Sequence, residues 1–390
     1  MDEPTGEPIT EPGSRSAAEL MAQAQALAES ARTVSAPNPW VGCVLVRDGE
    51  VVGMGATSPP GGAHAEVAAL ADAGSRARGA TAYVTLEPCS HHGRTPPCAD
   101  ALVAAGVARV VVALVDPDPR VGGAGIDRLR AHGVGVDIGL GVDRAARSLL
   151  PYLVHRRLGR ASCLLKVATS LDGRIAARDG SSRWITGPAA RADAHRLRAE
   201  SQAVVVGAGT AVADRPRLTV RDVTPAPTRQ PMRVVLDARG TVPADGPLFD
   251  PELAPTLVIT TPDGLATDAA PAWLAAGAKV LTVTPAADGG GVDLAASLGL
   301  LGGLEVLQAL VEGGGRLAGA LLAAGLVDRL VAYVAPTVLG RDGRVAFDVA
   351  GPDSIAHADR FRLVDVTRLG DDVRLDYVLA EQADGLLVST

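Results

Sequence analysis

A histidine, a glutamate and two cysteines follow one another in an order that suits a catalytic metal site. His64-Ala65-Glu66 is followed by Pro88-Cys89 and then by Cys98. A catalytic zinc site needs three protein ligands and one open position for water, and His64, Cys89 and Cys98 supply those three. Glu66 lies two residues after the histidine, where it can reach the water without binding the metal. The pattern predicts hydrolysis at a zinc ion, with Glu66 as general acid and base.

The same pattern is typical of zinc deaminases, in which an H-x-E triplet precedes a P-C-x-x-C segment. Here eight residues rather than two separate Cys89 from Cys98. Two alternatives stay open: the three residues could be ordinary core residues, or they could form a closed structural zinc site with His91 or His92 as fourth ligand. Glu66 and the proline before Cys89 favour the deaminase interpretation.

A second group of residues is suited to binding a nucleotide. Glu312-Gly313-Gly314-Gly315 follows an expected strand and opens an expected helix. Glycines let the backbone approach a phosphate, and free N–H groups at a helix N-terminus bind anions. The run is not the G-x-G-x-x-G of a Rossmann domain, so that fold is not predicted. Arg198 and Arg221 suit a sugar phosphate, although either could be a solvated surface charge. Lys166–Arg174 is a strand that runs into a tight turn, which alone could be any surface hairpin.

The first half of the chain alternates between helical and strand patterns after an initial helix and a hairpin around Asp48-Gly49. This order predicts an α/β sandwich with one mixed sheet. The expected strands are 42–47, 50–55, 82–86, 109–115 and 134–138, and the expected helices are 16–32, 64–73, 98–105, 126–132 and 143–158. Residues 1–15, rich in Glu, Pro and Gly, are expected to form a disordered tail.

The second half starts again with a strand after a polar, basic exit that contains Gly159. We therefore predict a deaminase domain over residues 16–159 and a second, independent α/β domain over residues 160–390. Its expected strands are 162–168, 203–206, 233–236, 257–260, 279–284, 309–312 and 329–335, followed by a hairpin of 362–367 with 373–378. Its expected helices are 188–199 and 317–324.

Composition narrows the classes of partner. The 390 residues carry a formal net charge of −7 and only 3% aromatic residues, which disfavours a nucleic acid partner. The N-terminus lacks the basic start and apolar run of a secretory signal, and no apolar stretch is long enough to span a membrane. Four cysteines are too few for a disulfide framework in a chain of this length, so we expect a cytoplasmic protein.

The segment from Glu87 to Cys98, E-P-C-S-H-H-G-R-T-P-P-C, resembles the signature of the bifunctional riboflavin-biosynthesis deaminase/reductase family. Pro37–Gly42 and Asp116–Pro119 are similar to two further motifs of that family, and the resemblance covers nearly the whole chain after the tail. It implies a cytidine-deaminase-like α/β/α sandwich followed by a dihydrofolate-reductase-like α/β domain. It also implies zinc-dependent deamination of 2,5-diamino-6-ribosylamino-4(3H)-pyrimidinone 5′-phosphate. NADPH-dependent reduction of the product, 5-amino-6-(5-phosphoribosylamino)uracil, to its ribitylamino form would follow.

The resemblance further implies site residues, position by position. The deaminase substrate pocket should contain Asn38, His91 and Arg94, with Asp116 near the ribose phosphate. Ala36, Thr57 and Asp118 depart from the commonest family pattern there. The reductase substrate should contact Ser182, Arg198, Leu218, Arg221 and Glu312. NADPH should contact Ala168, Trp184, Thr210, Asp214, Ala238, Gly314, Gly315, Arg316, Leu317, Ala318, Gly319 and Ala320. Lys166 is our candidate for polarising or protonating the opening sugar while hydride reaches its C1.

Several other functions remain to be weighed. One half could have lost activity and survive as a scaffold, or the deaminase could act on a related nucleobase substrate. A nucleic-acid-editing deaminase would share the zinc residues, but it predicts a basic groove that the acidic composition does not favour. A zinc-stabilised interaction module would not need Glu66. We expect small-molecule partners, neither nucleic acid nor membrane, and a homo-oligomer formed through the reductase domain.

Overall fold

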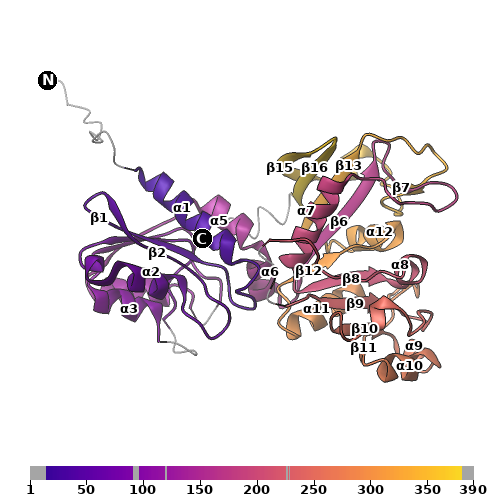
Figure 1. Cartoon of the computed structure of the whole chain (residues 1–390), viewed down its shortest axis with the longest axis horizontal. Helices are drawn as coiled ribbons and strands as arrows, with labels where there is room; N and C mark the ends of the chain where they lie inside the picture. The colour runs from indigo at the N-terminus through magenta and orange to yellow at the C-terminus, as the bar shows by residue number, and fades with distance from the viewer. Residues whose placement is uncertain (1–14, 91–95, 119–120, 225–226, 228, 380–390) are drawn as a thin grey trace. The chain divides into compact units, whose positions relative to one another are not determined.

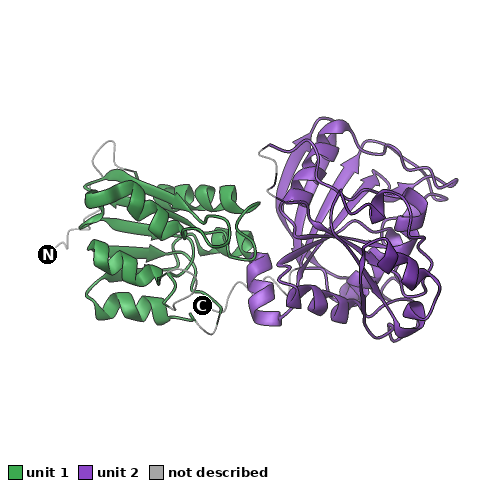
Figure 2. Ribbon diagram, turned by 60° about the horizontal axis from the view of Figure 1, so that its bottom comes forward, with its two compact units in different colours: residues 1–149, 390 green, residues 150–389 purple. Residues whose placement is uncertain are grey.

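The computed structural model of the chain describes residues 15–90, 96–118, 121–224, 227 and 229–379. It divides into two compact units, residues 1–149 and residues 150–389, drawn in two colours in Figure 2. The expected tail lies outside the described residues except for Arg15. Helix α6 (Leu150–Leu158) belongs to the second unit, whereas the boundary expected after Gly159 would assign it to the first. The division into functional domains at residues 159/160 stays a prediction.

The first unit is built on a five-stranded mixed sheet with the strand order β2-β1-β3-β4-β5. Strand β1 pairs antiparallel with β2 and β3, whereas β3, β4 and β5 run parallel. The mixed sheet expected from the sequence is therefore confirmed. The strands are β1 (Gly42–Arg47), β2 (Glu50–Ala56), β3 (Thr81–Val84), β4 (Arg109–Val112) and β5 (Gly135–Ile138).

Helices cover both faces of this sheet and make an α/β/α sandwich (Figure 1). Helices α1 (Ala17–Ala31) and α5 (Val142–Ser148) pack on one face. The other face carries α2 (Ala65–Ala73), α3 (Cys98–Ala105) and α4 (Ala124–Ala131), with the short η1 (Gly74–Ala77) after α2. Gly55 of β2 is required by this packing, because a Cβ there would lie 2.2 Å from the carbonyl oxygen of Ala65. The first turn of α2 can therefore lie directly on the sheet.

The prediction of a single helix over residues 143–158 is wrong. The structure has two helices there, α5 and α6, with Leu149 between them. Pro151 lies at the start of α6 and has no backbone N–H to donate to a preceding turn. The continuous helical hydrogen-bond ladder therefore cannot extend from one helix into the other.

The second unit contains a nine-stranded sheet with the order β11-β10-β9-β8-β12-β6-β13-β16-β15. The seven strands from β11 to β13 run parallel, and the hairpin of β16 and β15 adds two antiparallel strands at one edge. Strands β7 (Arg174–Ala176) and β14 (Arg344–Val345) form a separate pair. The sheet strands are β6 (Ser162–Ser170), β8 (Ala203–Gly207), β9 (Met232–Leu236), β10 (Thr256–Thr260), β11 (Lys279–Thr282), β12 (Gln308–Val311), β13 (Arg329–Ala335), β15 (Phe361–Leu369) and β16 (Asp372–Leu379).

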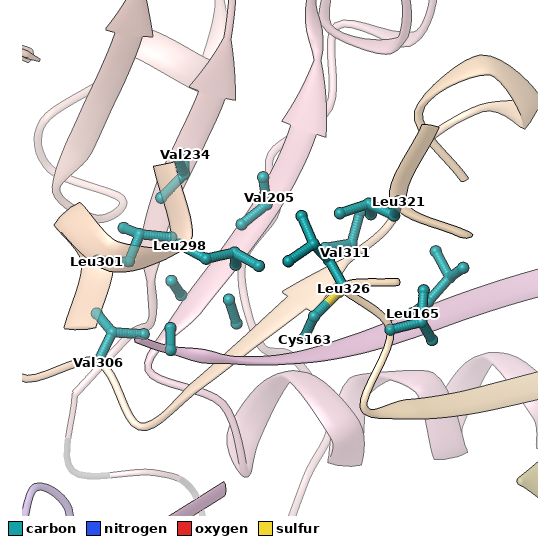
Figure 3. Packing of buried hydrophobic residues seen from close by; sticks show 14 of the residues in the cluster. Cys163, Leu165, Val205, Val234, Leu298, Leu301, Val306, Val311, Leu321 and Leu326 are labelled. Atoms are coloured by element: carbon teal, nitrogen blue, oxygen red, sulfur yellow. The ribbon is translucent and has the colours of Figure 1, made fainter. Parts of the chain in front are cut away.

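Two hydrophobic cores lie on the two faces of this sheet. Cys163 and Leu165 of β6 point into one core, and Leu164 points into the other, as the alternation of a strand requires. Figure 3 shows the first core, where Leu298 and Leu301 of α11 lie over the strands. That face carries α11 (Leu294–Gly303) and α12 (Gly315–Ala323), and the other carries α7 (Pro188–Ala199), α8 (Ala208–Asp214) and α10 (Ala269–Ala275).

The remaining short helices are α9 (Pro262–Leu265), η2 (Pro247–Phe249) and η3 (Ile355–His357). Both halves are thus α/β, as expected. Among the described residues, no helix combines the length and the apolar character needed to cross a bilayer.

The position of α6 yields a test of the domain boundary. Leu150 and Val154 of α6 are buried against Val378 of β16. Burial of one such side chain stabilises a fold by about 1.5–3 kcal/mol. We therefore expect a fragment that begins at Leu150 to be more stable than one that begins at Gly159 by about 3 kcal/mol. Urea unfolding of the two fragments measures this difference, and equal stabilities would instead favour the boundary at residues 159/160.

Two candidate active sites

The three predicted metal ligands of the first unit come together in space. The Nδ1 atom of His64 lies 3.2 Å from the Sγ of Cys98 and 3.7 Å from the Sγ of Cys89. All three ligand atoms lie within 4.8 Å of one another. Zinc bonds of about 2.1–2.3 Å at tetrahedral angles place ligand atoms about 3.5–3.8 Å apart. The donor set and its spacing therefore fit a zinc ion.

Two helix starts and one loop position these ligands. His64 is the N-cap residue of α2, and Cys98 is the first residue of α3. Because α2 and α3 pack side by side on one face of the sheet, their N-termini converge. Cys89 comes from the loop that follows β3, and its sulfur accepts a hydrogen bond of 3.4 Å from the backbone N–H of Cys98. The ligand set thus depends on the sheet and on two neighbouring helices.

The side chains of this cluster shift one another's pKa values. The interaction between the two cysteine side chains lowers the pKa of Cys89 to about 4 and raises the pKa of Cys98. Burial, together with the negative charge of Cys89, raises the pKa of Glu66 to about 7. Glu66 is only 3% exposed and is close enough to interact with the sulfur of Cys98. A proton-carrying group therefore lies beside the three ligands.

The expected contacts for the deaminase substrate are placed only in part. His91 and Arg94 lie outside the described residues, as does His92, the other candidate for a fourth ligand. Asn38 is half-buried in a turn, where its N–H donates to the carbonyl of Ser35 at 2.9 Å. Asp116 is buried, and its Oδ1 accepts a hydrogen bond of 2.9 Å from the N–H of Asp118.

The three departures from the commonest family pattern are all buried. Thr57 accepts a hydrogen bond of 3.0 Å at its Oγ1 from the N–H of Val41, which joins the end of β2 to the start of β1. Ala36 and Asp118 are 8% and 4% exposed. Thr57 therefore has a backbone partner that accounts for its hydroxyl group without a ligand.

In the second unit, three charged residues predicted for the reductase site form one cluster. The guanidinium of Arg198 makes two hydrogen bonds, of 2.6 and 2.9 Å, to the carboxylate of Glu312. The Nζ atom of Lys166 lies 3.9 Å from the same carboxylate and 5.8 Å from the centre of the Tyr333 ring. Burial alone would raise the pKa of Glu312, but Arg198 and Lys166 outweigh it and lower that pKa to about 2. Burial lowers the pKa of Lys166.

Arg221 lies beside this cluster on a different loop. Its guanidinium donates to the hydroxyl of Thr219 at 3.2 Å, and its backbone N–H donates to Nδ1 of His195 at 3.2 Å. Arg198 donates to the carbonyl of Thr219 at 3.0 Å, so the two arginines share a neighbour. Leu218 is buried in the second core, and its φ of 53° places it in the left-handed region.

The residues expected to contact NADPH gather at two neighbouring helix starts. The chain enters α8 directly from β8 and enters α12 shortly after β12, and these strands are paired. Thr210 Oγ1 would lie 3.8 Å from a Cβ on Gly314, and Arg316 would lie 3.6 Å from one on Gly209. Among the described residues, no side chain caps the N-terminus of α12. Its N–H groups are therefore free to bind a phosphate, which fits a dinucleotide.

The other expected cofactor contacts are more dispersed. Trp184 is 70% exposed, and the guanidinium of Arg191 lies 4.5 Å above its ring. Arg183 donates to the carbonyl of Asp214 at 3.3 Å, which joins the segment of Ser182 and Trp184 to the end of α8. The carbonyl of Ala238 accepts a hydrogen bond of 2.7 Å from Thr261. Ala168 is half-buried on β6. In α12, Ala318 and Gly319 are buried, and Gly315 and Leu317 are half-buried. Arg316 and Ala320 of the same helix are exposed.

Sequence reasoning did not single out three residues that the structure places in these sites. Glu87 is buried beside the Cys89 loop, His195 contacts Arg221, and Tyr333 lies under Lys166. Tyr333 is held by a hydrogen bond of 2.6 Å to Asp193. Only Glu87 had a signal in the sequence, since it directly precedes the Pro-Cys pair.

One α/β unit carries a set of three zinc ligands beside a buried glutamate, as in a zinc deaminase. The other carries two neighbouring helix N-termini beside a group of paired charges, as in a nucleotide-dependent reductase. The fold and the sites together define a two-domain deaminase and reductase. Residues 14–114 match the family model described as "Cytidine and deoxycytidylate deaminase zinc-binding region", and residues 161–375 match "RibD C-terminal domain". The chain belongs to the RibD family of bifunctional riboflavin-biosynthesis enzymes. It has a zinc-dependent deaminase half and an NADPH-dependent reductase half.

Relatives match over nearly the full length. The riboflavin biosynthesis protein RibD of Escherichia coli is 43% identical over 92% of this chain and 98% of its own. The structure of Acinetobacter baumannii RibD, 41% identical, aligns with a TM-score of 0.83 over 93% of this chain and 98% of its own. A diaminohydroxyphosphoribosylaminopyrimidine deaminase/5-amino-6-(5-phosphoribosylamino)uracil reductase from Thermotoga maritima is 29% identical, with a TM-score of 0.80 over 93% of this chain and 98% of its own.

The ligand geometry yields a direct test of the metal site. We expect Cys98→Ser to bind far less than one zinc per chain, because a serine hydroxyl is a poor substitute for a thiolate ligand. Elemental analysis of the purified protein measures the metal. NADPH oxidation with the deaminated substrate is the control and should not change. Full zinc occupancy in Cys98→Ser would contradict the assignment of this ligand.

Proposed function

We propose that His64, Cys89 and Cys98 hold the catalytic zinc and that Glu66 carries the proton of the deamination. The observation that carries this proposal is the convergence of three ligand atoms within 4.8 Å beside a buried glutamate. A zinc ion held by these three residues would supply a water of lowered pKa, and thus hydroxide at neutral pH. Glu66 accepts the proton of that water and delivers it to the departing amine. The substrate is 2,5-diamino-6-ribosylamino-4(3H)-pyrimidinone 5′-phosphate, with Asn38, His91, Arg94 and Asp116 as its contacts.

We further propose that Lys166 acts on the sugar during the reduction. NADPH, when bound, would supply the hydride for C1 of the ribosylamino group. Lys166 is half-buried between Glu312 and Tyr333, and its ammonium can donate a proton or a hydrogen bond to the ring oxygen as the sugar opens. Glu312 keeps the lysine in place through its negative charge. This environment supports a role in chemistry, because Glu312 and Tyr333 hold the ammonium of Lys166 in one position.

The two arginines have different roles in this proposal. Arg198 uses three of its N–H groups on Glu312 and on the carbonyl of Thr219, so it chiefly orients Glu312. Arg221 is exposed, and its guanidinium contacts the hydroxyl of Thr219 at 3.2 Å and Nε2 of His195 at 3.5 Å. Its planar fork suits a phosphate. Arg221 is therefore our candidate for the substrate phosphate, together with the exposed Ser182.

NADPH contacts are proposed at the starts of α8 and α12. Thr210, Gly314, Gly315, Arg316 and Leu317 belong to this cradle. Ala318 packs in the first core, so a contact there must use the backbone. Gly319 has no side chain, so a contact there must also use the backbone. The other expected NADPH contacts are Ala168, Trp184, Asp214, Ala238 and Ala320.

We also propose that the partners are small molecules rather than nucleic acids, that the chain works in the cytoplasm and that it self-associates through the reductase half. The edge strand β15 supports self-association, because Leu363, Val364 and Val366 are all exposed on it. An unpaired strand edge with apolar side chains is suited to pairing with another chain.

Glu66→Gln tests the proton carrier. The amide keeps the shape of the side chain but cannot exchange a proton, so we expect zinc to remain and deamination to slow by about 10²–10⁴-fold. Mass spectrometry of the pyrimidine product in a timed reaction measures the rate. Glu50→Gln, an exposed position on β2, is the matched control and should behave as wild type. Turnover near the wild-type rate in Glu66→Gln would rule out the proposed role.

Lys166→Ala and Arg221→Ala should change different kinetic parameters of the reductase. Loss of a group that acts at C1 lowers kcat, and loss of a phosphate contact far from C1 raises KM with little change in kcat. Steady-state NADPH oxidation with the deaminated substrate separates the two parameters. Zinc content and deamination should be unchanged in both variants. If Lys166→Ala altered only the affinity for NADPH, the lysine would be a cofactor contact and our mechanism at C1 would be wrong.

A further inference from the structure

Glu87 is buried in the first unit, and its side chain accepts hydrogen bonds from the segment that follows β4. It is 4% exposed and directly precedes Pro88 and the ligand Cys89. Its Oε2 accepts from the N–H of Asp116 at 3.2 Å and of Gly123 at 3.0 Å. Its Oε1 accepts from the N–H of Gly125 at 2.9 Å and of Ile126 at 3.3 Å. Four backbone donors thus meet one side chain.

These four donors belong to what we call the Asp116 segment, residues 114–118 and 121–126. Gly125 and Ile126 lie in the first turn of α4, where backbone N–H groups have no partner within the helix. An anion is favoured at a helix N-terminus, and hydrogen bonds to a charged acceptor are the stronger kind. The carboxylate of Glu87 therefore compensates its own burial by ordering a segment far from it in the sequence.

The backbone holds the two parts together as closely as the side chain does. The N–H of Glu87 donates to the carbonyl of Leu114 at 2.9 Å. A Cβ on Gly125 would lie only 1.9 Å from the carbonyl oxygen of Pro88. The start of α4 is therefore packed directly against the residue before Cys89. The position of the Asp116 segment relative to the metal ligand is fixed from both sides.

We infer that Glu87 is a positioning residue of the deaminase site, which sets the distance between the Cys89 ligand and the Asp116 segment. The inference rests on the proposed function, in which Asp116 binds near the ribose phosphate and Cys89 holds zinc. The ring of the substrate must reach the metal while its sugar phosphate occupies the other end of the pocket. A shift between the two parts weakens substrate binding, because both ends can no longer be bound together.

Glu87→Gln in the full-length protein tests this inference. The amide offers one acceptor oxygen, and its NH₂ group faces donors, so we expect two of the four hydrogen bonds to be lost. The expected result is about one zinc per chain, a KM for the diaminopyrimidine substrate raised about tenfold or more, and a smaller change in kcat. Glu50→Gln is the control for removal of a negative charge, and NADPH oxidation with the deaminated substrate reports on the untouched half.

Two outcomes would overturn the inference. An unchanged KM would show that Glu87 only stabilises the fold, and loss of zinc would show that it holds the metal loop rather than the substrate end. Glu87→Asp keeps the charge with a shorter reach, and it decides the question if Glu87→Gln does not fold. A raised KM with zinc retained in Glu87→Asp supports the inference, and a wild-type KM rejects it. Failure of the wild-type protein to deaminate would instead reject the proposed function itself.

Discussion

Burial of charge is the constraint on which both candidate sites depend. A carboxylate taken out of water is tolerated only where donors or cations replace the water. Glu87 meets this requirement with four backbone N–H groups, and Glu312 meets it with Arg198 and Lys166. Asp376 does so with Arg329 and Arg374. In each case at least one compensating group comes from a distant part of the chain, as Arg329 does for Asp376. Satisfying the charge therefore fixes the geometry of the surrounding segments.

The same constraint explains why the charged groups of the reductase cluster hold one another in place. Arg198 and Lys166 share one carboxylate, and Lys166 also lies over Tyr333. Tyr333 donates to Asp193, which in turn accepts from Arg374 at 2.9 Å. A continuous chain of paired groups thus runs from the lysine to the edge hairpin of the sheet. A lysine held in this way keeps little conformational freedom, which suits the fixed geometry that its proposed role requires.

The local sequence pattern predicted helices and strands well. It predicted contacts between side chains that are distant in the sequence poorly. The helices 98–105 and 188–199 and the strand 329–335 were predicted with their observed bounds, because apolar spacing and flanking Gly or Pro residues mark them. Helices α8 and α11 were missed, since both are short and contain glycine, a poor helix former. The ligands of the metal cluster could be predicted because residue type alone restricts zinc chemistry. The pairing of Arg198 with Glu312 could not, because 114 residues separate them and arginine is common on surfaces.

Both sites lie at the carboxyl-terminal ends of the parallel strands of their sheets. Cys89 follows β3 and Asp116 follows β4, and these parallel strands are neighbours. In the second unit, Glu312 and the glycine run follow β12, and Thr210 follows β8, its neighbour. In open α/β sheets, loops at the carboxyl ends of parallel strands converge with helix N-termini, which offer free N–H groups. At that edge the backbone itself supplies donors for Glu87 in one half and can supply them for a dinucleotide phosphate in the other. The two halves therefore reach unrelated chemistries from one architectural rule, and the difference between them lies in the side chains that each edge carries.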